Sequence, residues 1–232
     1  MKKILFVIIL IFWNCHPNKK LPPDRLEGEI KGLKKGTVYL SVLKDGKPQQ
    51  KDSIHIHGKG KFTFDLSSYP PQLMIIELKE KPGDYILFFA DDTVNKVITL
   101  LKKFGVNPII KGGVNTRKWL EYNKITQQYT DKRLELFKNQ WEASKEKDSI
   151  ALKQIEDDFE KLEKRRKLYG LNFAMTNASL PIGAYVALVE FYDNTKALDT
   201  LYKAMPEKVK QSVYGKQIRE RLNELKKEGQ KE

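Results

Sequence analysis

Short segments with alternating apolar and polar residues fill the first half of the chain. Alternation with a period of two is typical of strands with one buried face, because successive side chains of a strand point to opposite sides. Turn residues such as Asp45-Gly46, Gly58 to Gly60 and Pro82-Gly83 separate these segments at regular intervals. The pattern predicts about eight strands in an antiparallel β-sandwich-like domain over residues 26–112.

Two of these segments are apolar at every position, which distinguishes them from the others. They are Leu73 to Ile76 and Ile86 to Phe89. A strand without a polar face is expected to be buried on both sides. Both segments are therefore predicted to be central strands.

The pattern becomes helical after Gly112-Gly113. Apolar residues then recur every three to four positions in two long stretches, which the polar segment Lys145 to Ser149 separates. Asn115 or Thr116 is expected to cap the first helix, and Pro181 ends the second. Shorter helices are predicted over residues 182–192, 198–205 and 213–227, followed by a frayed tail at 229–232.

The second half is thus predicted to be an all-α domain over residues 113–228, built on a long antiparallel helical hairpin. Together the two halves give the α+β fold class. A stripe of aromatic residues on the first helix is expected to be core or domain interface, although it also suits a sugar or peptide groove. Its members are Trp119, Tyr122, Tyr129 and Trp141.

The N-terminus has a different pattern from both halves. Lys2 and Lys3 precede the unbroken apolar run Ile4 to Trp13, which is too short to span a bilayer but fits a signal peptide. Cys15, the single cysteine, lies two residues after Trp13, with Asn14 between them. We interpret residues 1–14 as a lipoprotein signal peptide, Cys15 as the site of lipidation by fatty acyl chains such as palmitate, and residues 15–25 as a tether. The alternative is an ordinary secretory signal followed by a free thiol.

These features predict a protein of the bacterial cell envelope, periplasm-facing and held to the membrane through a lipid at Cys15. The choice between inner and outer membrane stays open. The net charge of +13 is spread along the chain, and a basic stripe with interleaved aromatic residues is missing, so nucleic acid is not an expected partner. The basic surface suits an envelope protein, an anionic glycan or a lipid, or is simply a solvated face.

Candidate chemistry is sparse. His55 and His57 share one face of a predicted strand, but a metal site needs further ligands. Asp91-Asp92 at a strand end suits a cation or a ligand hydroxyl, or is an ordinary loop. Gly-x-Ser-x-Gly, CxxC and phosphate-binding glycine motifs are absent from the sequence. We therefore expect no catalytic residue, no cofactor, no metal and no enzyme activity.

Two charged clusters lie on the second predicted helix. They are Glu156 to Asp158 and Lys164 to Lys167. Their spacing puts both on its outer face, where pairs four residues apart contribute only about 0.2–0.5 kcal/mol. They are expected to be solvated surface.

Several segments resemble one known family in their order along the chain. Leu26 to Leu33 precedes Val38-Tyr39-Leu40, Lys51-Asp52-Ser53 and Gly60 to Phe64. This order is similar to the start of domain of unknown function 4369. Asn177 to Tyr185 and Lys210 to Lys216 also resemble segments of that family, so the resemblance runs over most of residues 24–228.

The resemblance implies an exported or lipid-anchored protein of Gram-negative bacteria. In many members a thioredoxin-like thiol-disulfide oxidoreductase domain follows, whereas this chain stops at Glu232. We therefore expect no redox chemistry from this chain and transfer no catalytic residue. Three functions are considered: a non-enzymatic binding module, an accessory subunit of a separate oxidoreductase, and a binder of an anionic glycan or lipid.

Overall fold

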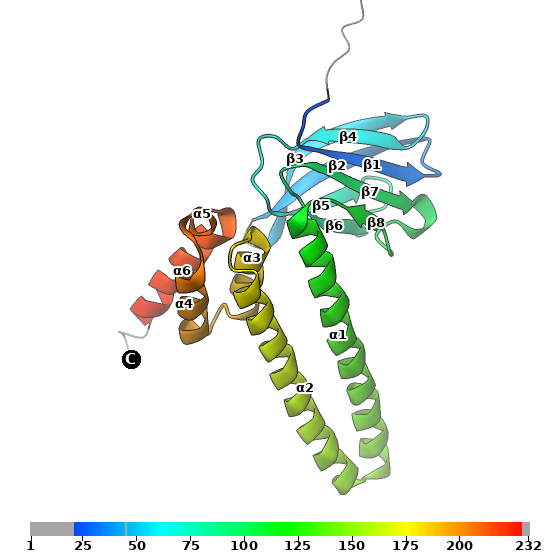
Figure 1. The fold of residues 1–232 in the computed structure, drawn as a ribbon. Helices are drawn as coiled ribbons and strands as arrows, with labels where there is room; N and C mark the ends of the chain where they lie inside the picture. Colours follow the sequence, from blue (N-terminus) through cyan, green and yellow to red (C-terminus); the bar gives the residue numbers. More distant parts are fainter. Residues whose placement is uncertain (1–20, 45, 229–232) are drawn as a thin grey trace, which may run out of the picture.

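The computed structural model describes residues 21–44 and 46–228. A β-rich part is followed by a helical part, so the predicted α+β class is confirmed (Figure 1). The eight strands are β1 (Arg25–Lys31), β2 (Lys35–Lys44), β3 (Lys47–His57), β4 (Lys61–Asp65), β5 (Leu73–Leu78), β6 (Tyr85–Phe89), β7 (Val94–Leu100) and β8 (Ile109–Lys111). A short 3-10 turn, η1 (Leu101–Lys103), follows β7.

The strands form two four-stranded sheets, with the orders β4-β1-β7-β8 and β3-β2-β5-β6. We call them sheet A and sheet B. All neighbouring strands are antiparallel except β1 and β7, which run parallel with Lys31 opposite Leu100. The expectation of a purely antiparallel sandwich is therefore corrected at this pair.

The side chains between the two sheets form one apolar core. β4 shows the alternation that the sequence predicts, because Phe62 and Phe64 are buried while their neighbours are exposed. The two rings meet edge to face at 5.7 Å, a favoured aromatic geometry. Gly28 of β1 leaves room for the ring of Phe62 at its register partner, since a Cβ there would overlap it.

Of the two strands predicted to be central, β5 is central and β6 is not. β6 lies at the edge of sheet B. Its residues are nevertheless apolar on both faces, because Ile86 and Phe88 face the sandwich core while Leu87 packs against the helices. A strand covered by helices thus has the same pattern as a strand in the middle of a sheet.

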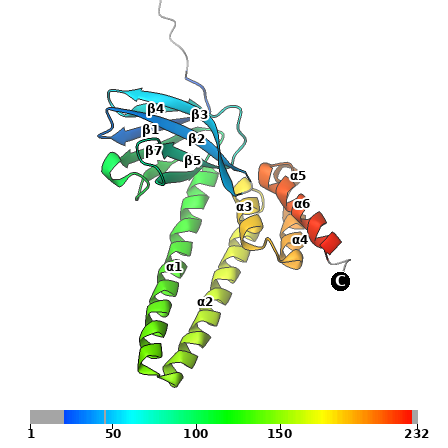
Figure 2. The same ribbon diagram turned by 180° about the vertical axis from the view of Figure 1, so that it is seen from behind.

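The helical part begins with two long antiparallel helices that project away from the sheets (Figures 1 and 2). The predicted hairpin is confirmed. Asp148 in the connecting turn caps the second helix by accepting from the backbone N–H groups of Ile150 and Ala151. The helices are α1 (Val114–Glu146), α2 (Ser149–Thr176), α3 (Pro181–Glu190), α4 (Thr195–Ala204), α5 (Glu207–Lys210) and α6 (Val213–Glu228).

The helical core lies at the end of the hairpin nearest the sheets and includes Leu73 of β5 and Phe89 of β6. The far half of the hairpin has no third helix to cover it. Trp141 is therefore 61% exposed, beneath the ammonium of Lys145, although Trp119 and Tyr122 are buried. The expectation of a core role is wrong for Trp141. None of the helices in the described ranges is both long and apolar enough to cross a membrane.

Candidate functional site

Asp91, between β6 and β7, caps the first long helix from outside that helix. Its carboxylate accepts from the backbone N–H groups of Asn115, at 3.3 Å, and Thr116, at 2.8 Å, in the first turn of α1. Gly113 at the N-cap has no side chain to do this, and a Cβ there would lie 2.8 Å from the Asp91 carboxylate. Unpaired N–H groups and the helix dipole both favour an anion at this position.

This arrangement corrects the expected cap. Asn115 and Thr116 lie inside the first turn, and their side chains also donate to Asp91, at 2.7 and 2.9 Å. The side-chain oxygen of Asn115 in turn accepts from the backbone N–H of Ile182 at the start of α3. Asn95 completes the network by donating to the carbonyl of Asp91. We call Asp91, Asn95, Asn115 and Thr116 the junction network; all four are buried.

Two buried residues of the junction network, Asp91 and Asn115, form the floor of a hollow of about 630 Å³ between the sheets and the helices. The hollow, which we call the junction pocket, is bounded by segments far apart in the sequence. Its lining combines apolar side chains with charged groups, hydroxyls and an amide. The apolar lining comprises Pro70, Pro71, Val114, Leu180, Pro181 and Val209, and the polar lining includes Asp92, Arg117, Ser179, Lys208, Gln211 and Ser212.

Asp92 is the acidic group of this pocket that the solvent reaches. Partial burial and then the negative charges of Asp24 and Asp91 raise the pKa of Asp92, while Lys208 lowers it. The carboxylate therefore lies in an acidic environment that a cation would relieve. Arg117 and Lys208 supply positive charge at the same rim. The pocket can thus pair with both charges of a polar ligand, and its lining carries neither histidine nor cysteine.

A second polar cluster, partly buried, joins three helices. Glu190 of α3 accepts from the hydroxyl of Tyr122 on α1 and from the guanidinium of Arg166 on α2. Burial, and then the hydrogen bond to Glu190, raise the pKa of the Tyr122 hydroxyl. The Tyr122 ring stacks on Tyr169 at 5.7 Å. Because each polar group has a protein partner, we assign this cluster to stability.

Arg166 corrects the interpretation of the basic cluster Lys164 to Lys167. Its guanidinium turns inward to Glu190, whereas Lys164, Arg165 and Lys167 are exposed as expected. In the acidic cluster Glu156 to Asp158, the first two residues are exposed and Asp158 is partly buried.

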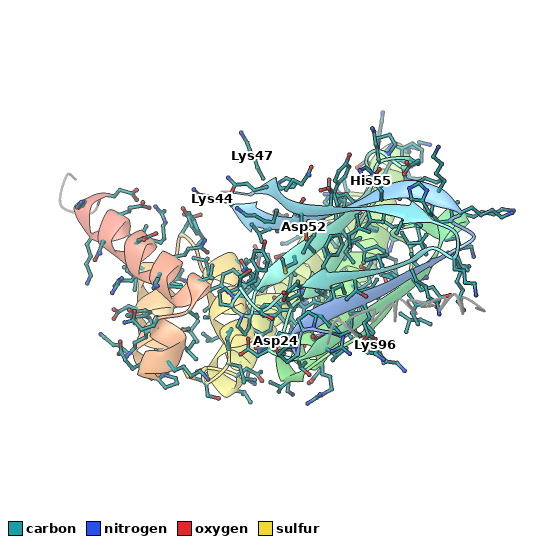
Figure 3. The ribbon with its side chains drawn as sticks, turned by 90° about the horizontal axis from the view of Figure 1, so that it is seen from above. Asp24, Lys44, Lys47, Asp52, His55 and Lys96 are labelled. Carbon is teal, nitrogen blue, oxygen red and sulfur yellow. The ribbon has the colours of Figure 1, made fainter. Side chains whose placement is uncertain are left out.

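The two histidines do not converge with further ligands. His55 Nδ1 lies 3.0 Å from the hydroxyl of Thr37 on the neighbouring strand, and both His55 and His57 are exposed on β3. Figure 3 places His55 on the opposite side of the β part from Asp24. Within residues 21–44 and 46–228, no three His, Cys, Asp or Glu residues are grouped as a metal site requires. Cys15, with the predicted signal peptide and most of the predicted tether, lies outside the described residues.

Sequence reasoning singled out the Asp91-Asp92 pair but missed the rest of the junction pocket. Arg117 is in the first turns of α1, Ser179 lies before α3, and Lys208 is in α5. These residues share no motif or spacing. Only the packing of the helices against the sheets brings them together.

Comparison with known proteins bears on the first part of the chain. Searches of curated proteins and of solved structures find no match. Residues 25–119 match the family described as a domain of unknown function, DUF4369. The match covers all eight strands and the first turn of α1 with the junction network, and the similar segments at residues 177–185 and 210–216 lie beyond it. The resemblance is therefore confirmed over residues 25–119, which match the model of the DUF4369 family.

Proposed function

We propose that the chain is a non-enzymatic binding module of the bacterial cell envelope, held to the membrane by a lipid at Cys15. The junction pocket is its ligand site. One observation carries this proposal: the pocket lies where the sheets meet the helices, above a fully hydrogen-bonded buried network. A preformed hollow on such a rigid floor is typical of binding sites.

The lining favours a peptide segment of another envelope protein as the ligand. Pro70, Pro71 and Pro181 offer an apolar wall for side chains. Asp92 on one side and Lys208 on the other offer an acceptor and donors for backbone and charged groups. Hydrolysis of such a peptide would require a nucleophile paired with a general base, whereas the hydroxyl of Ser212 donates to the carbonyl of Val209.

A photo-crosslinking amino acid at position 211 tests the pocket in living cells. Gln211 is exposed at the rim of the pocket, so the probe leaves the floor intact. We expect a discrete adduct from position 211, and its loss when Asp92→Asn and Lys208→Glu are combined. The matched control is the same probe at position 51, on the exposed strand β3, which should give no adduct.

The outcome also separates the alternatives. An adduct with a thioredoxin-like protein would identify the chain as an accessory subunit of a separate thiol-disulfide oxidoreductase. Equal adducts from positions 211 and 51 would contradict the pocket. A turnover by the purified protein that one polar substitution abolishes would contradict the non-enzymatic role.

The lipid anchor is tested separately by intact-mass analysis and detergent partitioning. We expect the natural chain to carry the mass of the acyl chains and to enter the detergent phase. The Cys15→Ser chain should lack both properties. An unmodified mass for the natural chain would instead indicate an ordinary secretory signal.

A further inference from the structure

The outer face of sheet A carries an exposed apolar surface at the end of β7 and β8. Leu100, Val106 and Ile109 are 50%, 58% and 55% exposed. With Ile98, Lys31 and Lys103 they line a shallow hollow of about 490 Å³. We call these six residues the β7–β8 patch. Isolated exposed aliphatic residues are ordinary, but a contiguous group indicates an interaction surface.

The loop between β7 and β8 holds this patch in a fixed shape. Phe104 is only 2% exposed and packs into the sandwich core. Gly105 follows at φ +84°, and a Cβ there would lie 2.9 Å from the carbonyl oxygen of Tyr85. The backbone N–H of Val106 then donates to the carbonyl of Lys103 at 2.9 Å. Burial of Phe104 therefore presents Val106 to the solvent.

The charge around the patch is positive. The sequence has no acidic residue between Asp92 and Glu121, a stretch that contains Lys96, Lys102, Lys103 and Lys111. Lys31, Lys102 and Lys103 are exposed. Lys96 lies on the same outer face, away from His55 (Figure 3), where it pairs with Glu27 at 3.2 Å. Glu29 on β1 is an acidic neighbour of the patch, since it is the register partner of Ile98.

The tether is long enough to put the patch and Cys15 on the same membrane. β1 begins at Arg25, and the patch lies at its other end, where Lys31 is opposite Leu100. Seven residues of strand span about 20 Å, whereas the tether can extend to about 35 Å. An anchor at Cys15 is therefore compatible with contact between the patch and the bilayer surface.

We propose that the β7–β8 patch lies on the anionic headgroups of the membrane. Lysines flanking exposed aliphatic side chains match the two components of such a surface, since the lysines attract the phosphates and the aliphatic groups enter the interface. A soluble acidic glycan would use the lysines but leave Leu100, Val106 and Ile109 in water. The exposed hairpin residues Leu134 and Trp141 lack this charge pattern, because acidic and basic residues alternate around them.

Vesicle flotation tests the proposal with full-length chains that all carry Cys15→Ser. No lipid is then attached, and the apolar leader contributes the same baseline to every chain. We expect tighter binding to vesicles of phosphatidylglycerol and phosphatidylcholine in equal parts than to phosphatidylcholine alone. Leu100→Ser with Val106→Ser and Ile109→Ser should weaken binding about tenfold, and Lys102→Glu with Lys103→Glu should do the same and reduce the dependence on salt.

Matched controls come from the hairpin. Leu134→Ser with Trp141→Ser removes exposed apolar groups elsewhere, and Lys124→Glu with Lys153→Glu makes the same charge change on exposed helix positions. Neither pair should alter binding. Circular dichroism verifies that each variant is folded.

Three results would overturn the proposal: patch variants that bind like the parent, hairpin variants that lose binding instead, or patch variants that only dissociate a dimer. Binding to a soluble acidic glycan that depends on the lysines alone would assign the patch to a glycan. The inference rests on the membrane location in the proposed function, but its test is distinguishable, because these chains cannot be acylated and the junction pocket lies at the other end of β1.

Discussion

The hydroxyl of Tyr214 on α6 accepts a hydrogen bond from the backbone N–H of Leu73 on β5, at 2.8 Å. The two residues are 141 positions apart, and both are buried. Together with the junction network, this bond joins the helical part to sheet B. The sheets and the helices are therefore coupled at the pocket that we propose as the ligand site.

Tyr214→Phe should lower the free energy of unfolding by about 1–3 kcal/mol, because the N–H of Leu73 loses its partner while staying buried. Denaturant unfolding measures the loss. Tyr185→Phe is the control, since Tyr185 packs against Tyr214 at 5.1 Å without a hydrogen bond from its hydroxyl among the described residues. It should cost clearly less, and an equal cost would mean that the Tyr214 bond adds no stability.

Asp91→Ala should lower the free energy of unfolding by at least about 2 kcal/mol, because it removes a helix cap and leaves several buried donors without an acceptor. Asp148→Ala provides the comparison. Asp148 caps α2 at an exposed turn and also accepts from two backbone N–H groups, both through Oδ1, and its loss should cost about 1 kcal/mol. If both variants lose the same free energy of unfolding, burial of the junction network adds nothing to the stability that the helix cap provides.

Asp92 should destabilise the fold at neutral pH. Its pKa is raised above its usual range, so the folded state holds the proton more tightly than the unfolded state does. The stability it contributes is present below the unfolded pKa and is lost as pH rises through the folded pKa. Asp92→Asn should therefore have a higher Tm than the parent at neutral pH, and the difference should vanish in acid.

Asp65→Asn serves as a control of opposite sign. Hydrogen bonds from Ser67 lower the pKa of Asp65, so its charge stabilises the folded state above the usual carboxyl range. This variant should have a slightly lower Tm at neutral pH, with the difference lost as pH falls. If the difference in Tm from the parent varied with pH in the same way for both variants, this would contradict the assignment of Asp92 to an acidic environment.

The Glu190 cluster should behave as a coupled unit. Tyr122 and Arg166 contact different oxygens of the Glu190 carboxylate. Loss of one hydrogen bond should therefore change how much the other contributes to the free energy of unfolding. A double-mutant cycle of Tyr122→Phe and Arg166→Gln should give a coupling of about 0.5–2 kcal/mol. Arg166→Gln combined with Thr200→Ala on α4 should be additive, and additivity in both pairs would mean that the carboxylate does not link the helices.

Local patterns in the sequence predicted the strands and the helical hairpin, because alternation and three-to-four spacing depend on near neighbours. Phe62 and Phe64 of β4 illustrate this. The same patterns could not show which other element, if any, packs against a given face of a strand or helix. Helices cover β6, so its apolar run resembles that of a central strand, and nothing covers Trp141, although it continues the apolar spacing of Trp119.

Partners distant in the sequence account for the remaining differences. The charge of Arg166 predicted a solvent-exposed side chain, but its guanidinium pairs with Glu190 of α3, whose side chain is largely buried. The pocket likewise depends on Asp92, Arg117 and Lys208, which come together only when the helices pack. A pairing of this kind leaves no periodic signal, so the candidate site could be predicted only at Asp91-Asp92.

The parallel pairing of β1 with β7 sets an order on folding. As the chain is synthesised, β1 emerges before the other strands, and one of its edges stays unpaired until Val94 to Leu100 follow. Sheet A therefore cannot be completed from successive hairpins, and its closure waits for a contact of long sequence separation, which slows folding. During that interval the unpaired edge of β1 is open to pairing with other chains, so the chain is most prone to strand pairing between copies before β7 has joined sheet A.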